Sequence, residues 1–268
     1  MKVFDRVRER FLVGVARQDR VDQQIDHLYD QVAGLMQIQS ALGGGPVLKP
    51  MRQWAISPDA IAVILADLQE RTRPSIVEFG CGQSTVVFAS WLKQRGGKLT
   101  TYEHDPHYAD VIHRQLDACG LSAIVTLRVV PLMDYAATGA LPPSKSYDLP
   151  DDRESFDVAL VDGPPYWAGE AGRYHPLRWS VDRMNPGGSV YLDDAARAPE
   201  QRIIAALKAA VPDVIVADEA RAEKGLVRIT RPSAKAHPLT EVFNNGSHAH
   251  GSGLSVADSV SHVSRVAS

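Results

Sequence analysis

Residues 76–92, IVEFGCGQSTVVFASWL, decide the fold. An apolar run that contains one acid, Glu78, stops at a short turn with Gly80 and Gly82, and a second apolar run follows. A buried strand, a turn and a helix account for this pattern, because glycine allows unusual dihedral angles and lets a ligand approach the backbone. Ser84 or Thr85 is expected to cap the helix, whose free N–H groups favour an anionic or polar ligand group.

Strand and helix patterns alternate on both sides of this stretch. Six further apolar runs read as strands, at residues 98–104, 123–130, 156–162, 188–194, 213–218 and 225–231. Helical patterns separate most of them, and the last two close the pattern as a strand pair. Another helical pattern precedes the first strand, at 57–71, with Ser57 as its expected N-cap and Pro58 in its first turn. This alternation predicts an α/β, Rossmann-like, doubly wound sheet of seven mostly parallel strands.

The two ends of the chain differ from this central domain, residues 46–231. Residues 1–45 predict an amphipathic helix that ends at 43–46, GGGP. Apolar residues recur along it at alternating spacings of four and three, which is a short heptad seam: Val21, Ile25, Leu28, Val32, Leu35 and, after one gap, Leu42. The helix either covers the domain or forms a coiled coil in a homodimer. Residues 232–268, rich in Ser, Gly and His, are expected to be a mobile tail.

Composition excludes several classes of protein. Hydrophobic residues make up 44% and charged residues 23%, as in globular proteins with a core. The net charge of −3 gives no basic surface for nucleic acid, and no apolar run is long enough to span a membrane. Two cysteines make neither a disulfide framework nor a zinc site, and the charged N-terminus does not resemble a signal peptide. A cytoplasmic protein is therefore expected.

A second acid indicates a nucleoside ligand. Glu103 ends the second predicted strand, where an acid accepts hydrogen bonds from ribose hydroxyls in this architecture. The dinucleotide fingerprint needs a third glycine, but Thr85 stands there. Glu78 would repel a pyrophosphate, whereas it could accept a hydrogen bond from an ammonium group. These two features disfavour an NAD-linked oxidoreductase, which is the first alternative.

Four segments resemble successive motifs of class I S-adenosylmethionine-dependent methyltransferases: VEFGCGQST (77–85), TYEHD (101–105), FDVALVDGPP (156–165) and NPGGSVYLDD (185–194). They are similar to a bacterial subgroup of small-molecule O-methyltransferases related to the catechol and macrolide-sugar enzymes. The resemblance implies S-adenosylmethionine as cofactor and a cofactor site that includes the following residues: Trp54, Ser57, Glu78, Gly80, Cys81, Gly82, Ser84, Thr85, Glu103, His104 and Asp162.

Three further acids are expected at the same edge of the sheet. Asp162 ends the strand at 156–162, and Asp193 and Asp194 end the strand at 188–194. Converging carboxylates repel one another unless a cation or a proton compensates, and Mg²⁺ prefers such oxygen ligands. The resemblance places metal ligands at these three positions, where the ion would lower the pKa of an acceptor hydroxyl. In the alternative, the chemistry is metal-free, Asp194 caps the next helix and Asp162 only ends a strand.

The segment that follows, residues 164–179, PPYWAGEAGRYHPLRW, suits a loop over the acceptor pocket. Arg173 is expected to pair with the acids or with an acidic substrate. His175 is either a general base or an ordinary surface histidine. Arg197 is expected to start the next helix and to contact a carboxylate.

The sequence therefore predicts an enzyme that transfers a methyl group to a hydroxyl of a small molecule, such as a sugar or glycan precursor. A non-catalytic cofactor-binding module is the second alternative, and the set Glu78, Glu103 and Asp162 disfavours it.

Overall fold

The computed structural model describes residues 2–232 apart from 47, 52–53, 152–153 and 220–221, and the side chains of the first helix from Gln18 on, except Arg20. The described residues belong to one compact unit, Met1–Ser233. All of the predicted tail except Pro232 lies outside the described residues.

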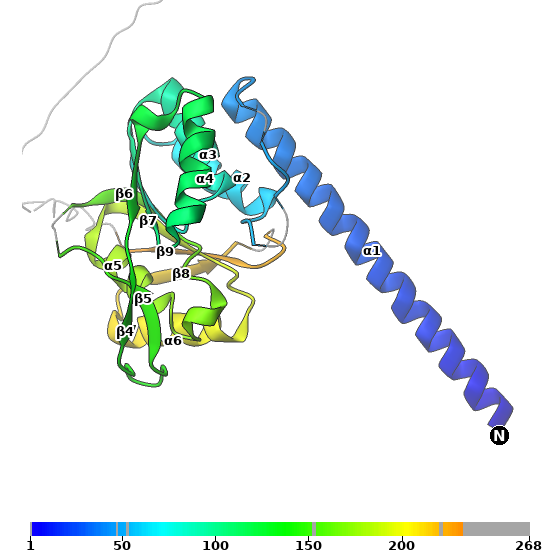
Figure 1. Ribbon diagram of the computed structural model, residues 1–268. Helices are drawn as coiled ribbons and strands as arrows, with labels where there is room; N and C mark the ends of the chain where they lie inside the picture. Colours follow the sequence, from blue (N-terminus) through cyan, green and yellow to red (C-terminus); the bar gives the residue numbers. More distant parts are fainter. Residues whose placement is uncertain (1, 47, 52–53, 152–153, 220–221, 233–268) are drawn as a thin grey trace, which may run out of the picture. The chain divides into compact units, whose positions relative to one another are not determined.

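A seven-stranded sheet forms the centre of this unit (Figure 1). Its strands lie in the order β3-β2-β1-β6-β7-β9-β8. Neighbours from β3 through β7 are parallel, and β9 pairs antiparallel with both β7 and β8. The predicted doubly wound, mostly parallel sheet is thus confirmed. The strand bounds are β1 Ser75–Phe79, β2 Lys98–Glu103, β3 Val125–Val129, β6 Phe156–Val161, β7 Met184–Asp193, β8 Ile215–Asp218 and β9 Leu226–Thr230.

Strand register brings the predicted acids to one edge. Glu78 of β1 pairs with Thr101 of β2 on one side and with Leu160 of β6 on the other. The carboxyl ends of β1, β2, β6 and β7 therefore lie side by side, as expected where ligands bind in open α/β sheets.

Helices cover both faces of the sheet and bury a core on each. One core includes Ile64 and Trp91 from the helices, and the other includes Leu177 and Leu207. Each buried side chain of this size contributes about 1.5–3 kcal/mol of transfer free energy. The helix bounds are α1 Lys2–Leu42, α2 Pro58–Gln69, α3 Gln83–Arg95, α4 Pro106–Ala118, α5 Tyr174–Arg183 and α6 Ala198–Ala210, with 3-10 turns η1 Ser122–Ile124 and η2 Tyr166–Ala168.

A small hairpin, β4 Leu132–Tyr135 with β5 Ser144–Tyr147, was not predicted. Its strands are only four residues long, and most of their side chains are polar or partly exposed, so they lack the apolar run of a buried strand. Tertiary contacts hold the hairpin: the Tyr135 hydroxyl donates to the Tyr147 carbonyl at 3.0 Å, and the Ser146 hydroxyl donates to the Gly172 carbonyl at 2.6 Å.

The C-terminal end of α1 packs against the domain (Figure 1). Ile38 and Leu42 are buried, and the Gln94 side chain donates to the Leu42 carbonyl at 2.5 Å. The seam upstream, from Val21 to Leu35, is exposed in the single chain. The helix therefore covers the domain only with its last turns. None of the described helices combines the length and apolar character that crossing a bilayer requires.

Candidate active site

A cavity of about 590 Å³ lies at the carboxyl edge of the sheet. It falls within the usual size range of small-molecule sites, about 300–1,000 Å³. Ten of the expected site residues line it: Trp54, Gly80, Cys81, Gly82, Ser84, Glu103, His104, Asp162, Arg173 and Asp194. Five others do not line it: Ser57, Glu78, Thr85, His175 and Asp193.

The glycine turn after β1 forms one wall of the cavity. Gly80 has φ of +93°, and a Cβ there would lie 3.4 Å from the Gly163 nitrogen, so a larger residue would be strained. Gly82, not Ser84 or Thr85, is the N-cap of α3. The predicted cap was wrong because the helix begins earlier: Thr85 lies in the first turn, where its hydroxyl accepts from the Gly82 N–H at 2.8 Å. Ser57 is the N-cap of α2, without a side-chain cap bond.

Glu78 lies beneath this turn and is fully buried. Its carboxylate accepts hydrogen bonds from the hydroxyls of Thr85 at 2.6 Å and Thr101 at 2.9 Å. Burial nevertheless raises the pKa of Glu78 to about 7, because a charged carboxylate loses its hydration there. The side chain thus supports the turn from below instead of facing the cavity.

Glu103 connects the ends of β1 and β2. Its carboxylate accepts from the backbone N–H groups of Cys81 at 3.0 Å, His104 at 2.8 Å and Asp105 at 2.9 Å. Burial by itself would raise the pKa of Glu103, but hydrogen bonds from His104 and these backbone groups outweigh burial and hold the pKa below its usual value. A charged acceptor therefore lies at the cavity wall at neutral pH.

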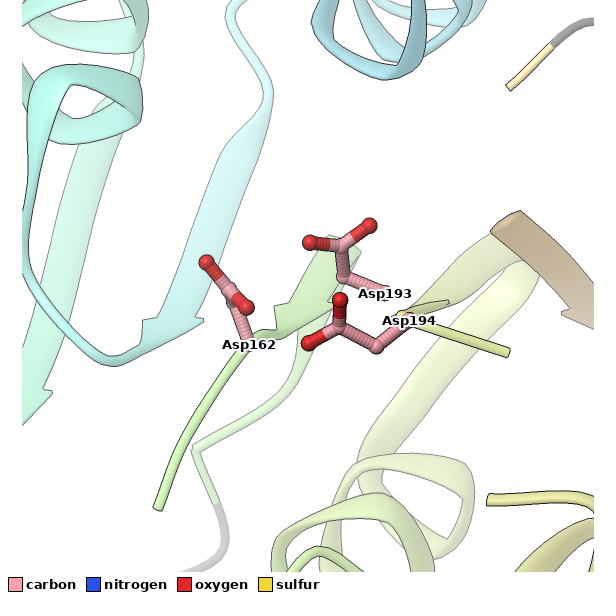
Figure 2. A group of neighbouring side chains, drawn as sticks. All are labelled: Asp162, Asp193 and Asp194. Carbon is pink, nitrogen blue, oxygen red and sulfur yellow. The ribbon is translucent and has the colours of Figure 1, made fainter. Parts of the chain in front are cut away.

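Asp162, Asp193 and Asp194 converge as predicted (Figure 2). One carboxylate oxygen from each lies within 4.8 Å of those of the other two. Asp194 adopts φ of +58°, which is uncommon for a residue other than glycine and is found more often at functional sites. The three acids come from the ends of β6 and β7, so the neighbouring parallel strands themselves bring the charges together.

Arg173 contacts two of these three acids. Its guanidinium lies 3.0 Å from an Asp194 oxygen and 3.4 Å from an Asp162 oxygen. It also donates to the carbonyls of Asp162 at 2.9 Å and Asp193 at 3.0 Å. Arg197, the N-cap of α6, pairs with Asp194 at 2.9 Å, which confirms its predicted contact. Arg173 thus pairs with the acids, one of its two predicted partners.

Arg173 and Arg197 bring two positive charges to three carboxylates. Both carboxylate oxygens of Asp193 are buried and have no hydrogen-bond partner among the described residues. Burial, then repulsion from Asp194, raises the pKa of Asp193 to about 6, and burial followed by repulsion from Asp193 raises that of Asp162 well above its usual value. The cluster therefore favours either an added proton or a divalent cation with oxygen ligands.

Aromatic side chains surround the mouth of the cavity. Trp54 and Tyr166 stack with ring centroids 5.5 Å apart and nearly parallel planes, although both are largely exposed. Trp167 packs against His104 at 5.3 Å. The predicted loop at 164–179 thus contributes two aromatic rings to this site.

His175 lies elsewhere. It packs on Tyr135 of the hairpin, with ring centroids 4.2 Å apart, and lines two smaller depressions. Burial lowers the pKa of His175, so the imidazole is mainly neutral at pH 7. It does not line the main cavity.

Several lining residues were not anticipated from the sequence: Lys49, Gln83, Asp105, Tyr108 and Tyr147. Tyr147 and Tyr108 belong to no recognisable motif. The folded hairpin brings Tyr147 to the cavity, and α4 brings Tyr108. Gln83 could have been found, since it lies inside the glycine turn; its side chain accepts from the Lys49 N–H at 2.9 Å.

Comparison with known protein families identifies the class of protein to which this fold and site correspond. Residues 77–195 match the family described as a methyltransferase domain. This matched segment holds the glycine turn and all three aspartates, and the resemblance inferred from the motifs is confirmed.

Individual proteins are similar to parts of the chain. A catechol O-methyltransferase of Niastella koreensis is 28% identical over 127 residues, 46% of this chain and 50% of that protein, so the match spans about half of the relative's length. A Podospora anserina methyltransferase solved with S-adenosylhomocysteine aligns with a TM-score of 0.51 and 15% identity, over 74% of this chain and 87% of that chain, and shares the fold. A Bacillus cereus O-methyltransferase aligns with a TM-score of 0.49 and 19% identity, over 76% and 90% of the two chains.

Proposed function

We propose that this protein binds S-adenosylmethionine in the cavity and transfers the methyl group to a hydroxyl of a small molecule. The observation that carries the proposal is the charged Glu103 carboxylate, held at the cavity wall by the backbone N–H of the glycine turn. Asp162 at the opposite side of the turn, behind Gly80, completes a site with an acid on each side.

The residues fit this cofactor by their chemistry. Glu103 offers oxygen acceptors to ribose hydroxyls, and the bare backbone around Gly80 and Gly82 allows close approach of the amino-acid portion. His104 and Trp167 offer flat surfaces to the adenine ring. When bound, the cofactor supplies a sulfonium-activated methyl group, and the protein contributes mainly by aligning the acceptor with it.

Asp162, Asp193 and Asp194 would hold a divalent ion such as Mg²⁺. The unpartnered Asp193 oxygens support this assignment, because buried carboxylate oxygens without a partner are rare. Such an ion supplies a positive charge that lowers the pKa of a hydroxyl. Arg173 pairs with Asp162 and so holds the carboxylates close to one another. The Asp162 side chain is 14% exposed and lines the cavity, where it can take up the proton of the substrate hydroxyl.

The acceptor is proposed to be a small hydroxylated compound, either a sugar or glycan precursor or a catechol. The stacked rings of Trp54 and Tyr166 at the mouth support this class, because flat aromatic faces pack against sugar or phenol rings. A panel of catechols and monosaccharides, with labelled S-adenosylmethionine and with or without Mg²⁺, identifies the acceptor.

Calorimetry tests the cofactor assignment directly. Purified protein titrated with S-adenosylhomocysteine should bind one equivalent per chain, and NADH should not bind. Binding of NADH, or no binding of S-adenosylhomocysteine at millimolar concentration, contradicts the proposal. The metal is tested separately by Mn²⁺ titration of wild type and Asp193→Asn, followed by electron paramagnetic resonance. The variant should bind Mn²⁺ more weakly, and equal affinity of the two proteins would contradict a metal site at these aspartates.

We further propose that α1 forms a homodimer through its exposed seam. The β-branched residues Ile25 and Val32 occupy a positions, and Leu28 and Leu35 occupy d positions. This arrangement favours a parallel coiled coil of two helices. Sedimentation of Leu28→Lys tests it: the wild type should be dimeric and the variant monomeric, whereas a monomeric wild type contradicts the proposal. Gln24→Lys, at a g position beside the seam, is the matched control and should stay dimeric.

A further inference from the structure

Tyr147 carries a polar group whose partner the polypeptide does not provide. The residue ends β5, and its ring is fully buried beside Phe79 at a centroid distance of 5.8 Å and edge-on to His104 at 6.4 Å. Its hydroxyl is buried, and no hydrogen-bond partner for it exists among the described residues. Buried tyrosine hydroxyls normally have a partner, and leaving one without a partner is destabilising.

The place of this hydroxyl suggests the missing partner. Tyr147 lines the same cavity as Glu103, His104 and Asp162. Gly163 makes the position possible, because a Cβ at that residue would lie only 2.1 Å from the Tyr147 oxygen. A larger residue in the turn after β6 would thus displace the hydroxyl from its place. Gly163 and the hairpin together hold a hydrogen-bond donor at the wall, beside the Glu103 acceptor.

The hydroxyl keeps its proton. Burial raises the pKa of Tyr147 well above that of a free phenol, and the nearby Glu103 charge acts in the same direction. The proton therefore stays on the oxygen throughout the physiological pH range. A protonated hydroxyl can donate to a group with a lone pair, such as a purine ring nitrogen or a ribose oxygen.

We propose that Tyr147 is a positioning residue that donates a hydrogen bond to the adenosine portion of the bound cofactor. This inference rests on the proposed function and adds a contact from the hairpin, a part of the chain that none of the sequence motifs includes. Glu103 would then accept from the nucleoside while Tyr147 donates to it, so the pair would distinguish an adenosine from an apolar ring of the same size.

The test is Tyr147→Phe, which removes one oxygen and keeps the ring packing against Phe79. Calorimetry is done with S-adenosylhomocysteine and with 5′-methylthioadenosine, which lacks the amino-acid group. Both affinities should fall by the same factor, about 3- to 10-fold, as expected for one neutral hydrogen bond. The melting temperature of the unliganded variant should be equal to or above that of the wild type, because an unpartnered buried hydroxyl is lost.

Tyr135→Phe is the matched control. It lies on the same hairpin, but its hydroxyl already donates to the Tyr147 carbonyl, so its loss should lower the melting temperature and leave both affinities unchanged. The inference is overturned if Tyr147→Phe binds both ligands as tightly as wild type, if only S-adenosylhomocysteine is affected, or if Tyr135→Phe reproduces the loss. A wild type that binds neither ligand overturns the proposed function as well, so the two failures are distinguishable.

Discussion

The Glu103 carboxylate accepts a hydrogen bond from the Cys81 backbone N–H at 3.0 Å, so the acid that ends β2 is fixed to the glycine turn after β1. This contact joins the two motifs that lie 22 residues apart in the sequence. It orients one carboxylate oxygen at the turn and the other at the backbone of Asp105. The site is therefore held in shape by backbone donors that do not depend on side-chain identity.

The first prediction concerns the charge of this acid. Glu103→Gln should lower the affinity for S-adenosylhomocysteine about 10- to 100-fold, because hydrogen bonds to a charged acceptor contribute roughly 1.5–3 kcal/mol. Isothermal titration calorimetry measures the change. Glu170→Gln, an exposed acid paired with Arg202, is the control and should bind as the wild type does. Equal affinities of the two variants for S-adenosylhomocysteine would mean that Glu103 does not contact the ligand.

The second prediction concerns Arg173. Arg173→Met should lower the free energy of unfolding by about 3–5 kcal/mol at pH 8, because Asp162 and Asp194 lose the buried cation that they share. The loss should be smaller at pH 5.5, where the carboxyls can take up protons. Urea denaturation at both pH values measures it. Arg178→Met, which breaks an exposed pair with Asp182, should cost less than about 1 kcal/mol. If Arg173→Met also lost less than about 1 kcal/mol of unfolding free energy, the acid cluster would not depend on the Arg173 guanidinium.

The third prediction is a pH dependence that arises at Glu78. Its pKa is about 7 in the folded protein against an ordinary value of 4.5, so the folded chain binds more protons than the unfolded chain between these values. Stability should therefore fall as pH rises from 4.5 to 7, by up to roughly 3 kcal/mol from this group. Asp193, with a pKa raised to about 6, adds a loss of the same sign.

Glu78→Gln isolates that contribution, since glutamine cannot ionise. Denaturation at pH 5, 6, 7 and 8 should show a flatter stability curve for the variant than for the wild type. The curve of Glu170→Gln should parallel the wild type. Parallel curves for Glu78→Gln and wild type would mean that the buried carboxyl does not change its protonation over this range.

The sequence pattern predicted the strands and helices of the main sheet, because their burial follows from the apolar residues within each segment. The run at 76–79 is buried because β1 is covered on both sides, and its short length and the glycine turn that follows it identify it as a strand. The convergence of Asp162 with Asp193 was also predictable, because neighbouring parallel strands end at the same edge.

Other features depend on contacts between distant segments. The strands of the hairpin, LMDY and SKSY, have no apolar run, so the place of Tyr147 at the cavity depends on packing against Phe79 and Gly163. Glu78 was expected to face the ligand, but it lies beneath the turn, where the Thr101 hydroxyl of the neighbouring strand donates a hydrogen bond to its carboxylate. His175 lies in the predicted loop region, yet α5 turns it toward Tyr135.

The last prediction concerns the attachment of α1. Gly34 is buried where the helix crosses the start of α2, and a Cβ there would lie 2.7 Å from the backbone nitrogen of Asp59 and the backbone carbon of Pro58. Backbone atoms at the first turn of a helix cannot move aside as a flexible side chain can. Gly34→Ala gains about 1 kcal/mol of helix propensity but should lose about 1–3 kcal/mol from overpacking.

The net effect should be seen as weaker attachment of α1 and not as loss of the helix. Hydrogen exchange of residues 35–42 should become faster, while circular dichroism at 222 nm stays unchanged. Gln37→Ala, exposed on the same helix, should leave exchange as slow as in the wild type. Unchanged exchange in Gly34→Ala would contradict the tight crossing, because an Ala side chain fits there only if the two helices already lie further apart.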